Sequence, residues 1–174
     1  MGSPYRHALK AITTAAILAL LDVLADVRAV EWPADPFFGL TTCNSGTIAG
    51  GTRANVVPAA AQTELHFRVA VPSADVLRRL EQVVRGRASI EVHTVTEPVR
   101  LIELPGFESC VVRYTTDAPH LSRWGSALVF GPGSILEAHT EREKVPKVEL
   151  RAAVGEFARL ARALLKEAGT EVRA

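Results

Sequence analysis

The most regular hydrophobic pattern in the chain lies between residues 60 and 71. Apolar or small side chains alternate there with polar ones: Ala61, Thr63, Leu65, Phe67, Val69 and Val71 against Gln62, Glu64, His66 and Arg68. A period of two residues is typical of a β-strand with one buried and one polar face. The pattern therefore predicts a half-buried strand whose polar face carries His66 and Arg68.

A three- and four-residue spacing of apolar positions predicts a first amphipathic helix, from about Tyr5 to Val30. Its stripe is Leu9, Ile12, Ala16, Leu20, Leu24 and Val27. The prolines of "EWPADP" end it, because proline cannot continue a helix. A strand is predicted next, over residues 37–48.

A second amphipathic helix is predicted directly after the alternating strand. It opens at Ser73 as N-cap and ends near Gly86, a residue that favours the left-handed conformation. Its apolar stripe is Val76, Leu77, Leu80, Val83 and Val84. Residues 89–95 then predict another strand.

Residues 1–97 thus read as helix, strand, strand, helix, strand. One strand in front would complete the split βαβ arrangement of ferredoxin-like domains. We expect that the chain begins too close to the first helix to contain that strand in full, and that it is an N-terminally shortened piece of a larger protein.

The rest of the chain, residues 98–174, predicts a second region. Strands are expected at "SCVVRY" (109–114) and "SALVF" (126–130), a short helix at "TTDAPHLSRW", and an amphipathic helix over 146–168. The apolar stripe of that helix is Leu150, Val154, Phe157, Leu160 and Leu164, and Gly169 is expected to stop it. The predicted fold class is therefore α/β: a ferredoxin-like domain at 1–97 followed by a partial α/β layer at 98–174. So few elements would leave apolar surface at Val111, Val112, Leu128 and Val129, which is typical of interaction surfaces.

Composition and charge narrow the possible partners. The chain is 48% hydrophobic and 22% charged, as in globular proteins, and its net charge of +1 does not suit a nucleic-acid binder. Arg6 and Lys10 precede "AITTAAILALL", which could be a short signal-peptide core or part of a buried helix; we favour the helix, and the run is too short to span a bilayer. Cys43 and Cys110 are far apart in the sequence, which favours reduced thiols in a cytoplasmic protein. We expect no membrane partner.

Several polar residues could carry chemistry, and each also has a purely structural interpretation. His139, within "GPGSILEAHTERE", could be a metal ligand or an ordinary loop histidine. Asn55, beside Arg53 in "GGTRANVVP", could bind a substrate or simply form a turn. Arg68 could bind a carboxylate or lie on a solvated sheet face. Thr116 and Asp117 could meet a ligand or cap a helix.

Three segments together resemble the M20 metallopeptidase family. "TIAGGTRANVVPAAAQTELHFRV" resembles its lid, or dimerisation, domain, and "YTTDAPHL" with "LVFGPGSILEAHTEREKV" resembles the last part of its catalytic domain. The closest pattern is that of acetylornithine deacetylase, and the resemblance covers nearly the whole chain. It implies a hydrolase of deacetylase or carboxypeptidase type that cleaves a small N-acyl amino acid or peptide and forms a homodimer.

The resemblance also implies roles for individual residues. A pair of zinc or cobalt ions activates water in this family, and a glutamate acts as general base. His139 matches a metal ligand, Asn55 and Arg68 match substrate-binding residues, and Thr116 with Asp117 matches a turn that lines the site.

The departures from the family pattern restrict these expectations. The family's His-x-Asp motif, bridging aspartate, paired glutamates and further acidic ligand all precede the lid and are not in this sequence. Gly2 stands near the place of a histidine that reaches into the partner's site, with His7 as an alternative substitute. We therefore assign no catalytic residue and expect the chain alone to bind catalytic metal weakly or not at all. It would be inactive alone, or be a non-catalytic dimerisation or binding module.

Overall fold

A computed structural model describes residues 3–13, 15–114 and 116–171 of the chain. It divides into two compact units. The first comprises the residues up to Arg100 together with Ser109–Gly125, and the second comprises Leu101–Glu108 and the residues from Ser126 on.

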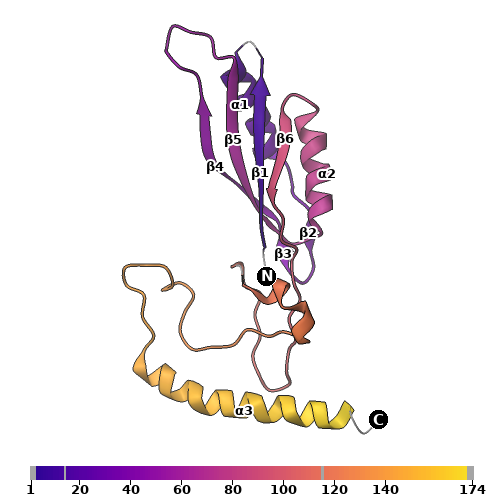
Figure 1. The fold of residues 1–174 in the computed structure, drawn as a ribbon, viewed down its shortest axis with the longest axis vertical. Coiled ribbons are helices and arrows are strands. Elements are labelled where there is room, and N and C mark those ends of the chain that lie inside the picture. Colours follow the sequence, from indigo (N-terminus) through magenta and orange to yellow (C-terminus); the bar gives the residue numbers. More distant parts are fainter. Residues whose placement is uncertain (1–2, 14, 115, 172–174) are drawn as a thin grey trace. The chain divides into compact units, whose positions relative to one another are not determined.

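The first unit contains a four-stranded antiparallel sheet and two helices (Figure 1). Its elements are β1 (Ser3–Ile12), α1 (Ala16–Ala29), β2 (Ala34–Asp35), β3 (Gly39–Leu40), β4 (Thr42–Gly50), β5 (Ala60–Val69), α2 (Ser73–Val84) and β6 (Ser89–Thr94). The strand order is β4-β5-β1-β6, and β2 with β3 forms a separate small hairpin. This is the split βαβ arrangement, so the α/β, ferredoxin-like prediction is confirmed for this part of the chain.

The predicted helix over residues 5–30 is wrong in its first part, because residues 3–12 form β1. The expectation that the first strand lies outside the chain is wrong for the same reason. His7, Leu9 and Ala11 are buried while Arg6 and Lys10 are exposed, which is the two-residue period of a strand. A buried histidine concealed that period, and Ile12, assigned to the helical stripe, is 72% exposed.

The core lies between the sheet and the two helices. It consists of Leu9, Ala11, Ala16, Leu20, Val23, Val27, Ala61, Leu65, Phe67, Val69, Val76, Leu80, Val83 and Val84. Every second residue of β5 contributes to the buried side, as the alternation predicted. The ring of Trp32 meets Phe67 edge-on with centroids 4.8 Å apart, an arrangement that aromatic pairs favour.

Both ends of α2 are fixed by residues from outside the helix. Ser73 does not cap the helix as predicted; its own backbone N–H donates to the Glu97 carboxylate at 2.9 Å, and its hydroxyl contacts the same carboxylate. A carboxylate at this position satisfies orphan N–H groups and suits the positive end of the helix dipole.

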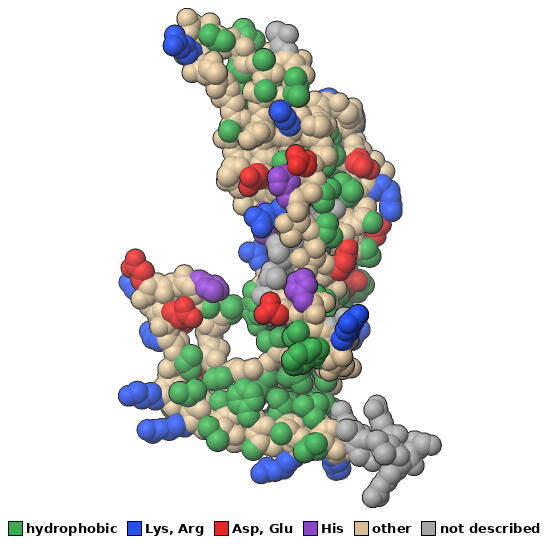
Figure 2. Space-filling model, in the orientation of Figure 1, with side chains coloured by type: hydrophobic (Ala, Val, Ile, Leu, Met, Phe, Trp, Pro, Cys, Tyr) green, Lys and Arg blue, Asp and Glu red, His purple; other side chains and the backbone are tan. Residues whose placement is uncertain are grey.

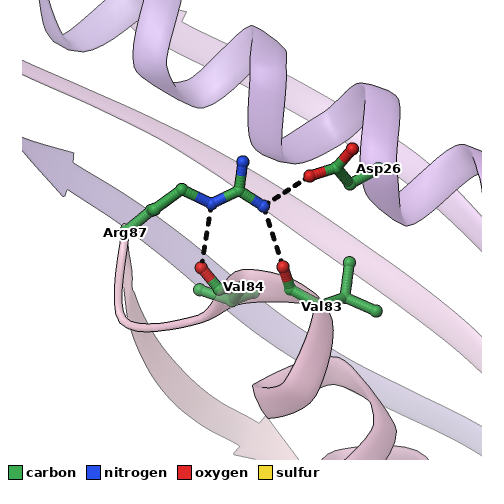
Figure 3. Close-up of polar contacts among 4 residues, drawn as sticks. All are labelled: Asp26, Val83, Val84 and Arg87. Carbon is green, nitrogen blue, oxygen red and sulfur yellow. Dashed lines mark hydrogen bonds and ion pairs between the residues drawn. The ribbon is translucent and has the colours of Figure 1, made fainter.

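Arg87 fixes the other end (Figure 3). Its guanidinium donates to the carbonyl oxygens of Val83 and Val84 at 2.8 and 3.1 Å and to the Asp26 carboxylate of α1 at 2.6 Å. A cation at the carboxyl end of a helix meets its unpaired carbonyls and the negative end of its dipole. The chain turns immediately after α2 through Gly86, whose φ of 71° confirms the predicted left-handed residue.

The second unit is built around α3 (Lys147–Glu171). The rings of Phe107, Phe130 and Phe157 meet edge-to-face, and the Arg159 guanidinium lies 3.8 Å from the centroid of Phe107. Leu160 is buried, but Val154 and Phe157 of the predicted apolar stripe remain exposed. Gly169, predicted to stop the helix, lies within it.

The two strands predicted in the second region are wrong. Residues 109–114 and 126–130 lie outside the strands of the described part of the chain, and only short 3-10 turns, η1 (Ala118–His120) and η2 (Ser122–Trp124), follow the first segment. An isolated strand leaves its backbone N–H and C=O groups without partners, so hydrophobicity alone does not hold a segment extended. Val111 and Val129 are exposed, and Val112 and Leu128 are half-buried.

The helices of the described residues include none long and apolar enough to cross a membrane.

We predict that Arg87→Ala destabilises the first unit more than Asp26→Ala. The arginine variant removes the guanidinium donor from the carbonyls of Val83 and Val84, and Val84 keeps the backbone N–H of residue 87. Losing these bonds costs about 1–2 kcal/mol for a partly exposed group. The aspartate variant removes only an exposed ion pair, worth about 0.5 kcal/mol or less. Urea unfolding followed by circular dichroism measures both, and equal losses would contradict the role assigned to the carbonyl bonds.

Candidate functional site

Two of the polar side chains singled out from the sequence, His66 and Arg68, lie on the exposed face of the sheet. On β5 the alternation places Glu64, His66 and Arg68 on the side opposite the core. The Arg68 guanidinium donates from Nη1 to the backbone carbonyl of Arg113, which holds the segment after residue 109 near the end of β5. Arg68 is therefore positioned by a backbone contact that the sequence did not indicate.

A second arginine shares this face. Arg6 on β1 is paired directly with His66 on β5. The pKa of His66 is lowered from its ordinary value, first by partial burial and then by the positive charges of Arg68 and Arg6. Sequence reasoning missed Arg6 because it assigned this segment to a helix; the alternation of Arg6 and Lys10 with His7 and Leu9 was the available signal.

Asn55 lies elsewhere on the same unit. It is exposed in the loop 51–59 between β4 and β5, where the Val56 N–H donates to the Arg53 carbonyl at 3.1 Å in a turn. Arg68 is eight residues, or about 26 Å, along β5 from the end of that loop, so the two side chains stand at opposite ends of the strand. The structure does not bring Asn55 and Arg68 of one chain together around a small ligand.

The Thr116–Asp117 turn precedes η1 in the first unit. The Thr116 hydroxyl accepts a hydrogen bond from the Ala118 N–H at 3.3 Å, and the Asp117 carbonyl accepts one from the His120 N–H at 2.9 Å. The Asp117 carboxylate makes no side-chain capping bond to η1. Hydrogen bonds within the segment thus stabilise this turn, and the Asp117 carboxylate takes no part in capping η1.

His139 lies in the second unit, in a turn with left-handed backbone. Its φ is 59°, which is uncommon for a residue other than glycine. The His139 N–H donates to the Glu143 carboxylate at 3.0 Å, and its side chain is exposed. The nearby N–H of Gly133 donates to the Glu149 carboxylate of α3 at 3.2 Å, which ties the Gly-Pro-Gly turn to that helix.

The residues around His139 do not form a metal centre. A zinc site needs three or four protein ligands, but the described part of the chain contains no group of three His, Cys, Asp or Glu side chains arranged to hold an ion. Glu143 is engaged with the backbone of His139. The described residues taken alone therefore do not provide the ligands that a pair of zinc or cobalt ions needs.

His7, considered from the sequence as a residue reaching into a partner's site, is instead part of the interior. It is 0% exposed, and its ring meets Phe67 edge-on with centroids 5.7 Å apart. Burial, with a smaller effect from the charge of His93, lowers the pKa of His7 to about 4. A side chain in this position serves the core and cannot extend into another subunit.

A large cavity lies between α1 and the edge strand β4. It has a volume of about 1060 Å³, and its lining includes Leu21, Arg28, Trp32, Cys43 and Ile48. Burial raises the pKa of the Cys43 thiol to about 12, so this cysteine stays protonated at neutral pH. Leu21 is 48% exposed and Ile48 is 57% exposed, which makes this edge the apolar side of the sheet domain.

Comparison with known proteins identifies the sheet domain. Residues 6–91 match the family model of the M20 peptidase dimerisation domain. The chain is 34% identical over 145 residues to a peptidase M20 domain-containing protein of Sordaria macrospora, covering 78% of this chain and 32% of that protein. It is 31% identical over 190 residues to a probable carboxypeptidase of Aspergillus clavatus, covering 95% of this chain and 42% of that protein.

A solved structure of a dinuclear metal-binding peptidase of the M20 family from Bacillus subtilis is also similar. It is 19% identical with a TM-score of 0.41, covering 53% of this chain and 25% of that one. The chain spans about a third to two fifths of the length of the curated relatives named above.

We predict that acid destabilises the first unit through His7. Its folded pKa of about 4 lies below the ordinary 6.5, so the unfolded chain binds one more proton between these values. Stability is therefore present above pH 6.5, declines as pH falls towards 4, and loses about 3 kcal/mol in total from this group. Unfolding free energies measured from pH 7 to pH 4 should show this slope.

The matched variants are His7→Leu, which should reduce the slope to the part that His66 contributes, and His120→Gln, which removes an exposed histidine and should not change it. A slope that persists unchanged in His7→Leu would contradict the assignment.

Proposed function

The chain belongs to the M20 peptidase family, and from that premise we propose that it is the substrate-binding lid and dimerisation module of a metal-dependent amide hydrolase. The observation that carries the proposal is the coincidence of the family's dimerisation domain, residues 6–91, with the sheet and its two helices. The relative from Aspergillus clavatus is named a probable carboxypeptidase, which supports cleavage of an amide in a peptide or N-acyl amino acid. A deacetylase of acetylornithine type performs the same chemistry on a shorter substrate.

In this function the chain's own residues bind and position substrate. Arg68 presents a guanidinium on an exposed face, the form that pairs bidentately with a carboxylate. Asn55, Thr116 and Asp117 are the further substrate-binding residues of the proposal, and His139 is its one metal ligand. Because Asn55 and Arg68 stand at opposite ends of β5, we propose that they serve two different sites of an assembled homodimer.

The metal step is not assigned to residues of this chain. Zinc or cobalt would supply an activated water in such an enzyme. Among the described residues His139 has no group of further ligands arranged around it, so a complete centre requires ligands from elsewhere. The alternative is a non-catalytic dimerisation or binding module, for which the match of residues 6–91 to the dimerisation domain is the supporting observation.

The homodimer is proposed to form along β4 and α1. β4 is an edge strand with a largely exposed surface, and such an edge presents unpaired N–H and C=O groups to a second strand. Leu18 and Leu21 on α1 and Ile48 on β4 add exposed apolar surface beside that edge. The free thiols Cys43 and Cys110 support a cytoplasmic location for the dimer.

We predict a dimer of twice the 18.7 kDa chain in light scattering. Leu21→Glu should dissociate it, because the substitution would bury an unpaired charge in the interface. Leu40→Glu, at an exposed apolar site on β3, should leave it intact. Dissociation by Val129→Glu instead would place the interface on the second unit, and a monomeric wild-type chain at high concentration would contradict the proposal.

Calorimetric titration with zinc and a hydrolysis assay distinguish the module from a complete enzyme. We expect weak zinc binding and no release of acetate from N-acetylornithine, or of the last residue from a peptide, with added zinc or cobalt. Tight binding of two ions per chain, or turnover that His139→Ala abolishes, would show that this chain carries a full centre.

A further inference from the structure

The exposed face of the sheet holds a group of cationic side chains around one point of the β1–β5 pairing. Arg6 and His66 are direct partners across the two strands, and Arg68 is two residues from His66 on the same face. Direct cross-strand neighbours have Cβ atoms about 5 Å apart, and diagonal neighbours about 7–8 Å apart. Both arginines are therefore within reach of one small ligand.

The surroundings leave these charges available. Among the described residues neither arginine forms an ion pair with a carboxylate, although Arg78, Arg87 and Arg159 do. Arg68 uses its Nη1 to bond the Arg113 carbonyl, which restricts the guanidinium while its remaining N–H groups point to no described acceptor. Figure 2 shows basic side chains and histidine side by side on the sheet, with acidic side chains next to them.

The neighbouring charges can be named strand by strand. Glu64 on β5 is two residues from His66 and opposite Ala8, and Glu91 on β6 is opposite Ala8 on its other side. His93 lies 3.9 Å from Glu91, between ring nitrogen and carboxylate oxygen. The acidic side chains thus form one row across the sheet, and the arginines lie beyond that row on the side of His66.

An irregularity in the strand pairing lies at the same point. The register of β1 with β6 shifts between Arg6 and His7. Bulges of this kind re-aim a side chain and are frequent beside functional sites. Arg6 is therefore placed by a local departure from regular pairing, whereas Lys10, four residues on, lies in regular pairing.

We propose that Arg6, His66 and Arg68 form a site for a ligand that bears two carboxylates, one held by each guanidinium with the imidazole between them. Planar guanidinium groups match carboxylates bidentately, and two arginines at diagonal strand positions, with Cβ atoms about 7–8 Å apart, can each reach one end of a short dicarboxylate. The inference rests on the proposed function and deepens it: the substrates of this lid are amides that carry a second acidic group. Arg6 and His66 are the specificity-determining residues, added to Arg68.

NMR titration of the whole chain with glutarate, and with valerate as the monocarboxylate of equal length, tests the site. We expect glutarate to bind at least about 10-fold more tightly, since each added charge-assisted contact strengthens binding. Arg6→Gln should remove that preference. Lys10→Gln, which removes one exposed charge from the same strand and face, should keep it.

The second readout is the pKa of His66, measured by NMR from the chemical shift of its ring proton. The titration runs from pH 8 to pH 5, which lies above the pKa of about 4 of His7. A bound dicarboxylate should raise the pKa of His66, because a nearby negative charge favours imidazolium. Arg6→Lys keeps the charge and should retain part of the effect.

Equal affinity for glutarate and valerate, an unmoved pKa of His66, or equal losses in Arg6→Gln and Lys10→Gln would each overturn the inference. These outcomes are separate from those of the dimer and hydrolysis experiments. A dimer that does not bind glutarate would contradict the site but not the proposed function. A monomer that binds glutarate would contradict the proposed dimer but not the site.

Discussion

The pairing of β1 between β5 and β6 is the interaction on which the first unit depends. All ten residues of β1 pair with β5, and the other edge of β1 pairs with β6. Side chains of a strand alternate between its two faces, so the register that buries His7, Leu9 and Ala11 also exposes Arg6 and Lys10. A slip by one residue would exchange these sets. The register of β1 therefore determines both which residues enter the core and which residues form the cationic face.

The helices are held on the sheet by packing and by polar contacts at the ends of α2. Glu97 accepts the Ser73 N–H at one end, and Arg87 donates to the last carbonyls and to Asp26 at the other. These contacts satisfy backbone groups that every helix end leaves unpaired. No corresponding element covers the outer edge of β4 within the described residues, and its surface is largely exposed. Helices thus cover one face of the sheet, and β4 is an edge strand with exposed surface, which suits a domain that associates with a second copy.

The functional residues suggested by the family pattern are distributed rather than gathered. Asn55 and Arg68 occupy opposite ends of β5, and His139 belongs to the second unit. A distribution of this kind is expected for a module that contributes to a composite site. It also directs attention to Arg6 and His66, which lie beside Arg68 and which the family pattern did not single out.

The sequence by itself determined the elements whose pattern is local and unambiguous. The alternation of residues 60–71 gave β5 and its polar face, the stripe from Val76 to Val84 gave α2, and Gly86 marked its end. The motifs around Asn55, Thr116 and His139 were enough to suggest the family. These predictions succeeded because periodicity and turn chemistry act over a few residues.

Only the tertiary structure decided the state of residues 3–12 and the absence of strands at 109–114 and 126–130. Apolar spacing across residues 9–27 fitted a helix, yet pairing with two neighbouring strands holds the first part extended. Residues 109–114 and 126–130 are apolar enough for strands but form no strand ladder among the described residues; the Ile102 N–H donates to the Ala127 carbonyl as an isolated backbone contact. A strand is stabilised by hydrogen bonds to segments far away in the sequence, so a local pattern cannot establish whether those partners exist. The meeting of Arg6 with His66 depends on the same long-range pairing, which is why that site became visible only in the folded chain.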